Sequence, residues 1–373
     1  MKHNDTLSKL YVEITTHCNL DCAMCVRRAW QEPIGEMPLA VFAELMEQVR
    51  YLPTPPVIHL SGYGEPTCHP DFLEIVALAK ATGARVEMTS NGTLLTRSLI
   101  AALIDLDLDR LVVSIDSTEA ANYADIRVNA SYSQVLANLL ELKRQRISRH
   151  GRHGNPQLAI AFVAMQRNVA DLARLPMLAI RLGAWEVLVS NVVPHTAEME
   201  EDILYQKALQ ACAFRESRWV PAMSLPKLDL NETTAGPLAG AFGSTASIKL
   251  LDASLSARND YCRFAQEGYA AVRWDGTVSP CLSLLHDHPE YIRGRRKDIT
   301  HHSFGNIDDL PLGAIWRDQP FSDFRQRLRA FHFSPCTTCG GCERFPANYV
   351  DCIDNTFPTC GGCLWAQGFV QCA

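Results

Sequence analysis

Apolar residues in the first 218 positions recur in two alternating patterns. Short apolar runs, typical of buried strands, are each followed by a segment in which apolar residues recur every three or four positions, as on one face of a helix. The strand-like runs cover residues 10–15, 57–61, 85–89, 110–115, 157–165 and 186–193. Strands that alternate with helices pair in parallel. Six such units predict an α/β fold built on a partial, TIM-like (β/α)6 barrel.

Capping residues delimit the predicted helices. Thr96 precedes the predicted helix 97–106, and Ser133 precedes the predicted helix 134–147. A hydroxyl at this position accepts a hydrogen bond from a backbone N–H of the first turn. Pro176 falls inside a further helical pattern and is expected to interrupt or kink it.

Polar residues follow the strands where they end, which is the edge at which a barrel places its active site. After the second strand, residues 61–66 read Ser-Gly-Tyr-Gly-Glu-Pro. Glycines let a backbone approach a ligand closely, whereas the same letters taken alone indicate a turn. The candidate ligand-binding residues at the strand ends are Gly62, Gly64, Glu65, Ser90, Asn91, Ser114, Asp116, Asn168 and Asn191.

Three cysteines, Cys18, Cys22 and Cys25, directly follow the first strand. A 4Fe-4S cluster normally takes four thiolates. Three thiolates therefore leave one iron open, as in metal sites that bind a substrate. A zinc site is the alternative, and it needs a fourth ligand, for which His17 and Cys68 are the nearest candidates.

Nine of the fourteen cysteines lie from residue 262 onward. They are Cys262, Cys281, Cys336, Cys339, Cys342, Cys352, Cys360, Cys363 and Cys372. Disulfides are disfavoured in a chain without an export signal. Two 4Fe-4S clusters would use eight of these thiolates and leave one spare, while a zinc ribbon is the alternative for residues 336–363.

These patterns predict three parts of the chain. Residues 1–218 form the barrel, and residues 262–373 form a small iron-sulfur domain. Between them, residues 219–261 contain repeated proline and glycine and are expected to be an irregular linker.

Composition and charge indicate where the protein is located and which partners it is expected to bind. The 373 residues are 47% hydrophobic and 20% charged, with a formal net charge of -6. This balance argues against nucleic acid as a partner, although short basic runs occur at 143–152 and 293–297. No apolar run is long enough to span a membrane, and the first residues lack an apolar signal segment. We expect a cytoplasmic protein that does not bind membranes.

The spacing Cys18-x3-Cys22-x2-Cys25 after the first strand resembles the signature of the radical SAM superfamily. The resemblance implies that these cysteines hold a 4Fe-4S cluster. It further implies that S-adenosylmethionine (SAM) chelates the open iron and is cleaved reductively to a 5'-deoxyadenosyl radical.

Other motifs resemble the SAM-binding residues of the same superfamily. Residues 62–65 look like its glycine-rich motif, which implies that Gly64 and Glu65 contact the methionyl amino group. Arg127 matches an arginine that holds the SAM carboxylate in related enzymes. The alternative to this role is a surface ion pair of Arg127 with Asp125 or Glu119. Asn168 and Asn191 resemble positions near the ribose and the adenine; for Asn168, helix capping is an alternative that can hold together with this role.

The C-terminal cysteines resemble the SPASM domain, an auxiliary cluster module of radical SAM maturases. Cys262, Gly276 and Cys281 follow its entry pattern, with a predicted strand at 269–274 and a turn at Asp275-Gly276. The later cysteines depart from the usual SPASM spacing. The tail 357–372 is similar to a subgroup of maturases that act on tungsten-containing aldehyde oxidoreductases.

Together these resemblances predict a radical SAM maturase for a tungsten-cofactor oxidoreductase. The implied partners are a protein or peptide substrate, for which the tungsten enzyme or its cofactor is the candidate, and a ferredoxin or flavodoxin as the electron donor. The alternatives are a SPASM enzyme that forms thioether or carbon-carbon links in a peptide, a formylglycine-forming sulfatase maturase, and a non-catalytic cluster scaffold. Five histidines are further candidates for a substrate site, although isolated histidines are more often structural: His195, His286, His288, His301 and His302.

Overall fold

The computed structural model describes residues 6–206, 222–226, 228–242, 247–250, 253–254, 262–330, 336–337 and 342–372. Its main sheet has eight strands in the order β11-β10-β1-β2-β3-β4-β5-β6. The six strands of the first half are β1 (Lys9–Val12), β2 (Val57–Leu60), β3 (Val86–Ser90), β4 (Arg110–Ser114), β5 (Gln157–Ala164) and β6 (Glu186–Asn191). Neighbours among these six strands are parallel. The predicted partial barrel is therefore confirmed.

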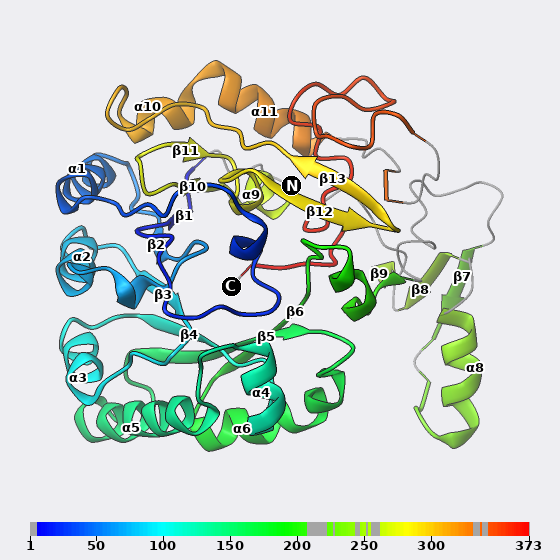
Figure 1. Ribbon diagram of the computed structural model, residues 1–373, viewed down its shortest axis with the longest axis horizontal. Coiled ribbons are helices and arrows are strands. Elements are labelled where there is room, and N and C mark those ends of the chain that lie inside the picture. Colours follow the sequence, from blue (N-terminus) through cyan, green and yellow to red (C-terminus); the bar gives the residue numbers. More distant parts are fainter. Residues whose placement is uncertain are drawn as a thin grey trace.

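Helices cover the outer face of this curved sheet (Figure 1). They are α1 (Leu39–Arg50), α2 (Phe72–Lys80), α3 (Arg97–Asp105), α4 (Ala120–Ile126), α5 (Tyr132–His150) and α6 (Leu175–Leu182). Residues from the strands and from the inner faces of these helices form one continuous apolar core. Pro176 lies in the first turn of α6, after the 3-10 helix η3 (Val169–Arg174), where its missing N–H costs nothing.

The N-caps confirm one prediction and correct another. The Thr96 side chain accepts a hydrogen bond from Leu99 N at the start of α3, as expected. The cap of α5 is Ser131, whose side chain accepts from Gln134 N. The predicted cap Ser133 lies inside the helix instead. Both serines precede the same apolar pattern, so the pattern alone does not separate them.

Residues 222–254 contain more regular structure than the proline and glycine content predicts. The described parts hold β7 (Ala222–Leu225), α8 (Glu232–Phe242), β8 (Ser247–Leu250) and β9 (Ala253–Ser254), and the three strands form a small separate sheet. Asn231 Oδ1 accepts from Thr233 N and Thr234 N and starts α8. The expectation of an irregular linker is thus corrected for these residues: a capped helix forms there although Pro237 lies inside it.

The cysteine-rich part begins by completing the main sheet. After α9 (Arg263–Glu267), β10 (Tyr269–Val272) pairs in parallel with β1, and β11 (Val278–Ser279) pairs antiparallel with β10. Gly276 in the connecting turn has φ +82°, a conformation that favours glycine. The turn at 275–276 is as predicted, but the pairing with β1 was not predicted.

The remaining elements lie around β10 and β11, and the two helices among them continue the outer layer of helices beyond α1 (Figure 1). They are η5 (Leu282–Leu284), the hairpin β12 (His288–Ile292) and β13 (Arg295–Ile299), α10 (Leu312–Arg317) and α11 (Gln319–Arg329). The described residues after Arg329 form no helix and no named strand. Among all described residues, no helix has the length and apolar character that crossing a membrane would require.

Candidate active site

The loop that carries Cys18, Cys22 and Cys25 connects β1 to the 3-10 helix η1 (Val26–Ala29), which lies within the curve of the main sheet in Figure 1. Its backbone is held by the chain beyond β4, because Ala23 N donates to the carbonyl oxygen of Ile126 at 2.8 Å. Cys22 is buried, and the other two cysteines are partly buried. The three thiols therefore share one fixed, largely dry loop.

The three thiols influence one another electrostatically. Burial raises the pKa of all three, that of Cys22 to about 11; neighbouring thiolates raise the pKa of Cys22 and Cys25 further, and the charge of Glu65 does so for Cys18. The positive charge of Arg127 lowers the pKa of Cys22. Leu20 N at 3.4 Å and Asn91 Nδ2 at 3.9 Å donate to Cys18 Sγ.

This donor set fits an iron-sulfur cluster. A buried thiol loses its proton when the sulfur binds a metal. N–H donors and a nearby guanidinium then stabilise the thiolates, as they do around iron-sulfur clusters. The loop supplies three such thiols, which leaves one coordination position of a 4Fe-4S cluster for another ligand.

Glu65 is the centre of the neighbouring glycine loop. Its carboxylate is buried and accepts from Ser90 Oγ at 2.8 Å, from Asn91 N at 2.7 Å and from Thr67. Burial raises the pKa of Glu65, and these hydrogen bonds oppose the rise. Glu65 thereby ties the end of β3 to the glycine loop, so that three predicted site residues, Glu65, Ser90 and Asn91, lie together.

The two glycines of this loop allow it to pack against the cysteine loop. A Cβ at Gly64 would overlap the carbonyl oxygen of Thr15, and a Cβ at Gly62 would overlap the Glu13 side chain. Glu65 N also donates to the carbonyl oxygen of His17 at 2.8 Å. The close approach that we expected at these glycines is therefore made to the chain's own cysteine loop.

Arg127 forms a buried ion pair. Its Nε lies 2.6 Å from Asp116 Oδ2, and the Asp116 side chain has no exposed surface. Val163 N donates to the other carboxylate oxygen of Asp116 at 2.7 Å. Burial lowers the pKa of Arg127, but the charges of Asp116, Cys22 and Tyr123 and the hydrogen bond to Asp116 together outweigh burial and leave the pKa raised. The alternative of a surface ion pair with Asp125 or Glu119 is thus wrong, since Arg127 is buried beside Cys22.

The two predicted asparagines make backbone contacts. Asn168 Nδ2 donates to the carbonyl oxygens of Asp116 and Val163, and its Oδ1 accepts from Met165 N. It therefore bonds the chain around β5 and does not cap η3 with its side chain. Asn191 Nδ2 donates to the carbonyl oxygen of Phe369 at 2.8 Å.

The C-terminal tail therefore lies along β6. Besides the contact of Phe369, Gln371 N donates to Ser190 Oγ at 3.0 Å. Phe369 also stacks on Tyr205 with ring centroids 5.0 Å apart. Sequence reasoning missed this arrangement, because contacts between residues about 180 positions apart leave no local pattern. Ser114, the remaining predicted residue, is half-buried at the end of β4.

Five C-terminal cysteines lie close together. Cys262, Cys360 and Cys363 pack against one apolar cluster, while Cys262, Cys281 and Cys372 pack against another that includes Tyr11 and Phe264. Burial raises the pKa of each of these thiols, that of Cys363 to about 12 and that of Cys372 to about 11. Neighbouring thiolates contribute to the rise at Cys281, Cys360 and Cys363.

The other C-terminal cysteines lie elsewhere. Cys336 and Cys342 pack against the apolar cluster around Phe345 and Leu364, and Cys352 is exposed. Cys339 lies outside the described residues. Of the eight described C-terminal cysteines, five thus lie together, and Cys336 and Cys342 share a second apolar cluster.

Two of the candidate histidines lie near the end of β6. His195 Nδ1 is 2.9 Å from the carbonyl oxygen of Pro289, and its ring lies 5.4 Å from that of His288. Burial lowers the pKa of His195 to about 4, so the ring is neutral. His288 lies 3.6 Å from Glu290, and both are buried. The alternation of His288 and Glu290 on β12 was the signal that could have grouped these two residues. His301 and His302 lie apart from this group, with His301 on the surface beside Asp287.

The comparisons with known proteins decide the family. A model of the radical SAM superfamily matches residues 12–154, and a model of the SPASM iron-sulfur cluster-binding domain matches residues 262–343. The tungsten-containing aldehyde ferredoxin oxidoreductase cofactor-modifying protein of Pyrococcus furiosus is 30% identical over 370 residues, which cover 97% of this chain and 96% of that protein. The chain belongs to the radical SAM superfamily.

Two further radical SAM proteins are similar over most of the chain. PqqA peptide cyclase of Gluconobacter oxydans is 26% identical over 364 residues, which cover 94% of this chain and 89% of that protein. The crystal structure of Streptococcus suis SuiB bound to the precursor peptide SuiA has a TM-score of 0.57 at 14% identity, and the match covers 91% of this chain and 70% of SuiB. At that identity the structural match shows the fold.

Membership confirms the predicted enzyme class and cofactors. The protein is a radical SAM maturase of the SPASM subfamily, a SAM-dependent enzyme with 4Fe-4S clusters. The predicted alternative of a non-catalytic scaffold is therefore not needed to explain the cysteines.

Proposed function

We propose that this enzyme acts in the maturation of a tungsten-cofactor oxidoreductase. The observation that carries the proposal is the similarity to the Pyrococcus furiosus cofactor-modifying protein, which extends over nearly the whole length of both chains. The similarity therefore includes the C-terminal part, where radical SAM maturases of different substrates are expected to differ.

In this proposal, Cys18, Cys22 and Cys25 hold the SAM-binding cluster. With one electron from the donor, the cluster and SAM would supply the radical chemistry for hydrogen abstraction from the target. Arg127 Nε donates to Asp116. The two terminal amino groups of the guanidinium would then be the donors for the SAM carboxylate. The glycine loop with Gly64 and Glu65, together with Ser90, Asn91 and Ser114, surrounds the remaining polar groups of SAM.

The grouping of cysteines supports an assignment of the auxiliary clusters. Cys262, Cys281, Cys360 and Cys363 hold the first cluster, because the charges of the other three thiolates, and not that of Cys372, raise the pKa of Cys281. The second cluster takes Cys336, Cys339, Cys342 and Cys352. Cys372 is the ninth thiol of the C-terminal part, and in this assignment it is the spare one.

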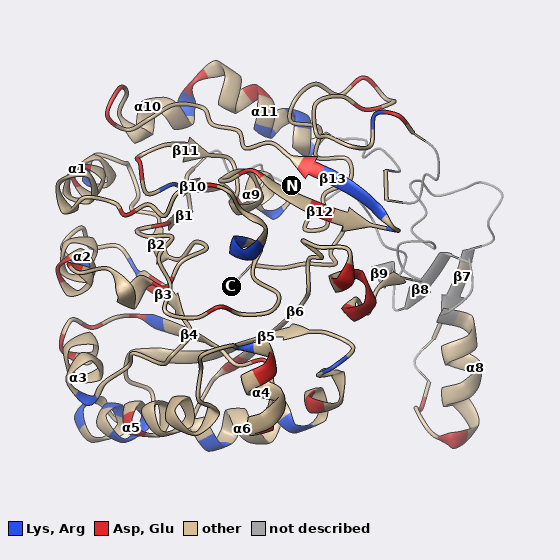
Figure 2. Ribbon diagram, viewed as in Figure 1, with Lys and Arg blue, Asp and Glu red and all other residues tan. Residues whose placement is uncertain are grey.

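The proposed electron donor is a ferredoxin or flavodoxin, and the proposed substrate is the tungsten enzyme or its cofactor. The basic runs do not mark an obvious docking site for an acidic donor. Figure 2 shows Lys and Arg on α5 and on β13. On α5, Lys143 and Arg146 bind backbone carbonyl oxygens, and Arg144 pairs with Glu141. Arg296 on β13 pairs with Asp298.

The direct test is to produce a tungsten-dependent aldehyde oxidoreductase in an anaerobic host with and without this protein. We expect active oxidoreductase when the two are produced together. Little activity should appear with the Cys18→Ala/Cys22→Ala/Cys25→Ala variant. Equal oxidoreductase activity in the presence and absence of the maturase would contradict the proposal.

A peptide-modifying enzyme is the second candidate, and the similarity to PqqA peptide cyclase over 94% of the chain favours it. Peptide-modifying enzymes change the mass of a precursor peptide. Mass spectrometry of a short peptide encoded beside this protein, after incubation with SAM and reductant, would reveal a new crosslink if this candidate is correct.

A further inference from the structure

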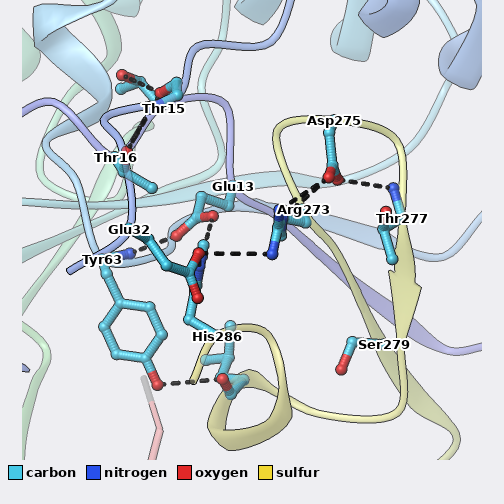
Figure 3. A network of polar contacts seen from close by, with 12 residues as sticks. Glu13, Thr15, Thr16, Glu32, Tyr63, Arg273, Asp275, Thr277, Ser279 and His286 are labelled. Carbon is cyan, nitrogen blue, oxygen red and sulfur yellow. Dashed lines mark hydrogen bonds and ion pairs between the residues drawn. The ribbon is translucent and has the colours of Figure 1, made fainter. Parts of the chain in front are cut away.

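A buried histidine of the SPASM module contacts two carboxylates that lie on either side of the cysteine loop (Figure 3). His286 Nε2 is 2.7 Å from Glu13 Oε2, and His286 Nδ1 is 2.8 Å from Glu32 Oε2. Glu13 precedes Cys18 by five residues, and Glu32 follows Cys25 by seven. One imidazole thus joins both ends of the loop that carries the three cysteines.

Both ring nitrogens of His286 face carboxylate oxygens, which accept hydrogen bonds. A ring that donates at both nitrogens is an imidazolium. Burial lowers the pKa of His286, but the hydrogen bonds and charges of Glu13 and Glu32 outweigh burial and raise it. The His286 and Glu13 side chains are 1% and 0% exposed, so water does not compete for these contacts.

The same contacts reach the glycine loop. Glu13 Oε1 accepts from Tyr63 N at 2.9 Å, and Tyr63 lies two residues before Glu65. The Tyr63 hydroxyl donates in turn to the carbonyl oxygen of Leu282, the residue after Cys281. Figure 3 shows Tyr63, Glu13 and His286 side by side. His286 therefore lies where the cysteine loop, the glycine loop and the SPASM module meet.

Aromatic and charged neighbours fix the ring in this position. Trp30 packs on His286 with ring centroids 4.3 Å apart, and the Tyr63 ring lies at 5.8 Å, nearly perpendicular. Arg273 lies 3.5 Å from Glu32, and Asp287 N donates to the same carboxylate at 3.0 Å. The carboxylate of Glu32 is thus held on both sides by the SPASM module.

We propose that His286 is a positioning residue of the SAM site, through which the SPASM module sets the relative position of the cysteine loop and the glycine loop. SAM cleavage needs the sulfonium and the cluster at a fixed distance and angle, and small displacements of catalytic groups cost large factors in rate. The proposal rests on superfamily membership and is independent of the tungsten substrate.

The test compares His286→Leu and His286→Gln with the parent enzyme in SAM cleavage without any partner. We expect His286→Leu to lower the rate of 5'-deoxyadenosine formation at least tenfold at saturating SAM, with parental iron content. His286→Gln should recover part of the rate, because its amide can donate to one of the two carboxylates. The electron paramagnetic resonance spectrum of the reduced protein with SAM should change in His286→Leu.

A second readout does not depend on loaded enzyme. In cluster-free protein, hydrogen exchange at residues 18–25 should be faster in His286→Leu than in the parent, while exchange in α3 stays the same. His301→Leu is the matched control, since His301 belongs to the same module and pairs with Asp287 at 2.8 Å but is exposed. It should behave as the parent in both readouts.

Parental SAM cleavage by folded His286→Leu would overturn the proposal, whether or not hydrogen exchange at residues 18–25 becomes faster. If His286→Leu does not fold, Glu32→Gln takes its place, because Glu32 is partly exposed and its loss leaves the buried contact with Glu13 intact. In that variant as well, parental exchange together with parental cleavage would overturn the proposal.

Discussion

The barrel and the cysteine-rich module reach a stable structure by different means. In the barrel, buried strands and helices supply a continuous apolar core, which includes Phe42, Ile58, Leu111 and Phe162. The described residues of the module after Arg329 form no helix and no named strand, and apolar residues there, such as Leu364 and Phe369, share an apolar cluster with Met165 and Val192 of the barrel. The start of the module, with Val272 and Trp316, shares the barrel core. For residues 342–372 we expect stability to depend on contacts with the barrel and on bound metal.

Removal of iron should destabilise the module far more than the barrel, and this is the largest difference that we expect between the two regions. Where metal ligands organise a small irregular domain, metal binding supplies much of its folding free energy. We expect chelation to increase hydrogen exchange sharply across residues 342–372 and to leave β2 to β5 protected. Exchange that increases equally in both regions would show that the barrel also requires its cluster to fold.

The buried ion pair between Asp116 and Arg127 should be the most sensitive polar contact of the barrel. Asp116→Asn leaves the guanidinium buried without its counter-charge, and loss of one partner of such a pair costs about 3 to 5 kcal/mol in the free energy of unfolding. Glu141→Gln, which breaks the solvent-screened pair with Arg144, should have a far smaller effect. Urea unfolding of cluster-free protein measures both, and equal costs would contradict the burial of Asp116.

Acid should destabilise the barrel through His59. Burial lowers the pKa of His59 to about 4, below its usual 6.5, so the folded state favours the neutral ring. The resulting stability is present above about pH 6.5 and is lost as the pH falls toward 4, by up to about 3 kcal/mol. His59→Gln should flatten this part of the curve of unfolding free energy against pH. An unchanged slope between pH 6.5 and 4 would contradict the neutral ring.

The smallest predicted effect concerns the cap of α5. Ser131→Ala should lower the free energy of unfolding by about 1 kcal/mol, because Gln134 N loses its acceptor. Ser133→Ala is the matched control, since Ser133 lies inside the helix and its loss should cost less than about 0.5 kcal/mol. Thermal unfolding of the two variants distinguishes them. A larger loss of stability in Ser133→Ala than in Ser131→Ala would show that Ser133 is the N-cap, as the sequence predicts.

The sequence predicted the barrel well because its signals are local. Apolar runs, their spacing and the polar residues at strand ends identified all six strands and brought Glu65, Ser90 and Asn91 to one edge. What it did not predict depends on contacts between distant residues. Examples are the pairing of β10 with β1 and the contact of His286 with Glu13, which are about 260 and 273 positions apart.

The site was therefore predicted in part. The cysteines of the first loop are recognisable by spacing alone, and Arg127 was recognised by resemblance. A single glutamate after an apolar strand, such as Glu13, has no comparable signal, since many strands end in a charged residue. Its role became visible only when the fold placed a histidine of the module beside it.

The most direct test of the account is SAM cleavage by the Cys18→Ala/Cys22→Ala/Cys25→Ala variant. Anaerobically reconstituted parent protein should carry about twelve irons in three four-iron clusters, and the variant should carry about eight. We predict that the variant forms no 5'-deoxyadenosine from SAM and reductant, while Cys68→Ala cleaves SAM as the parent does. Formation of 5'-deoxyadenosine by the triple variant at the parental rate would contradict the account.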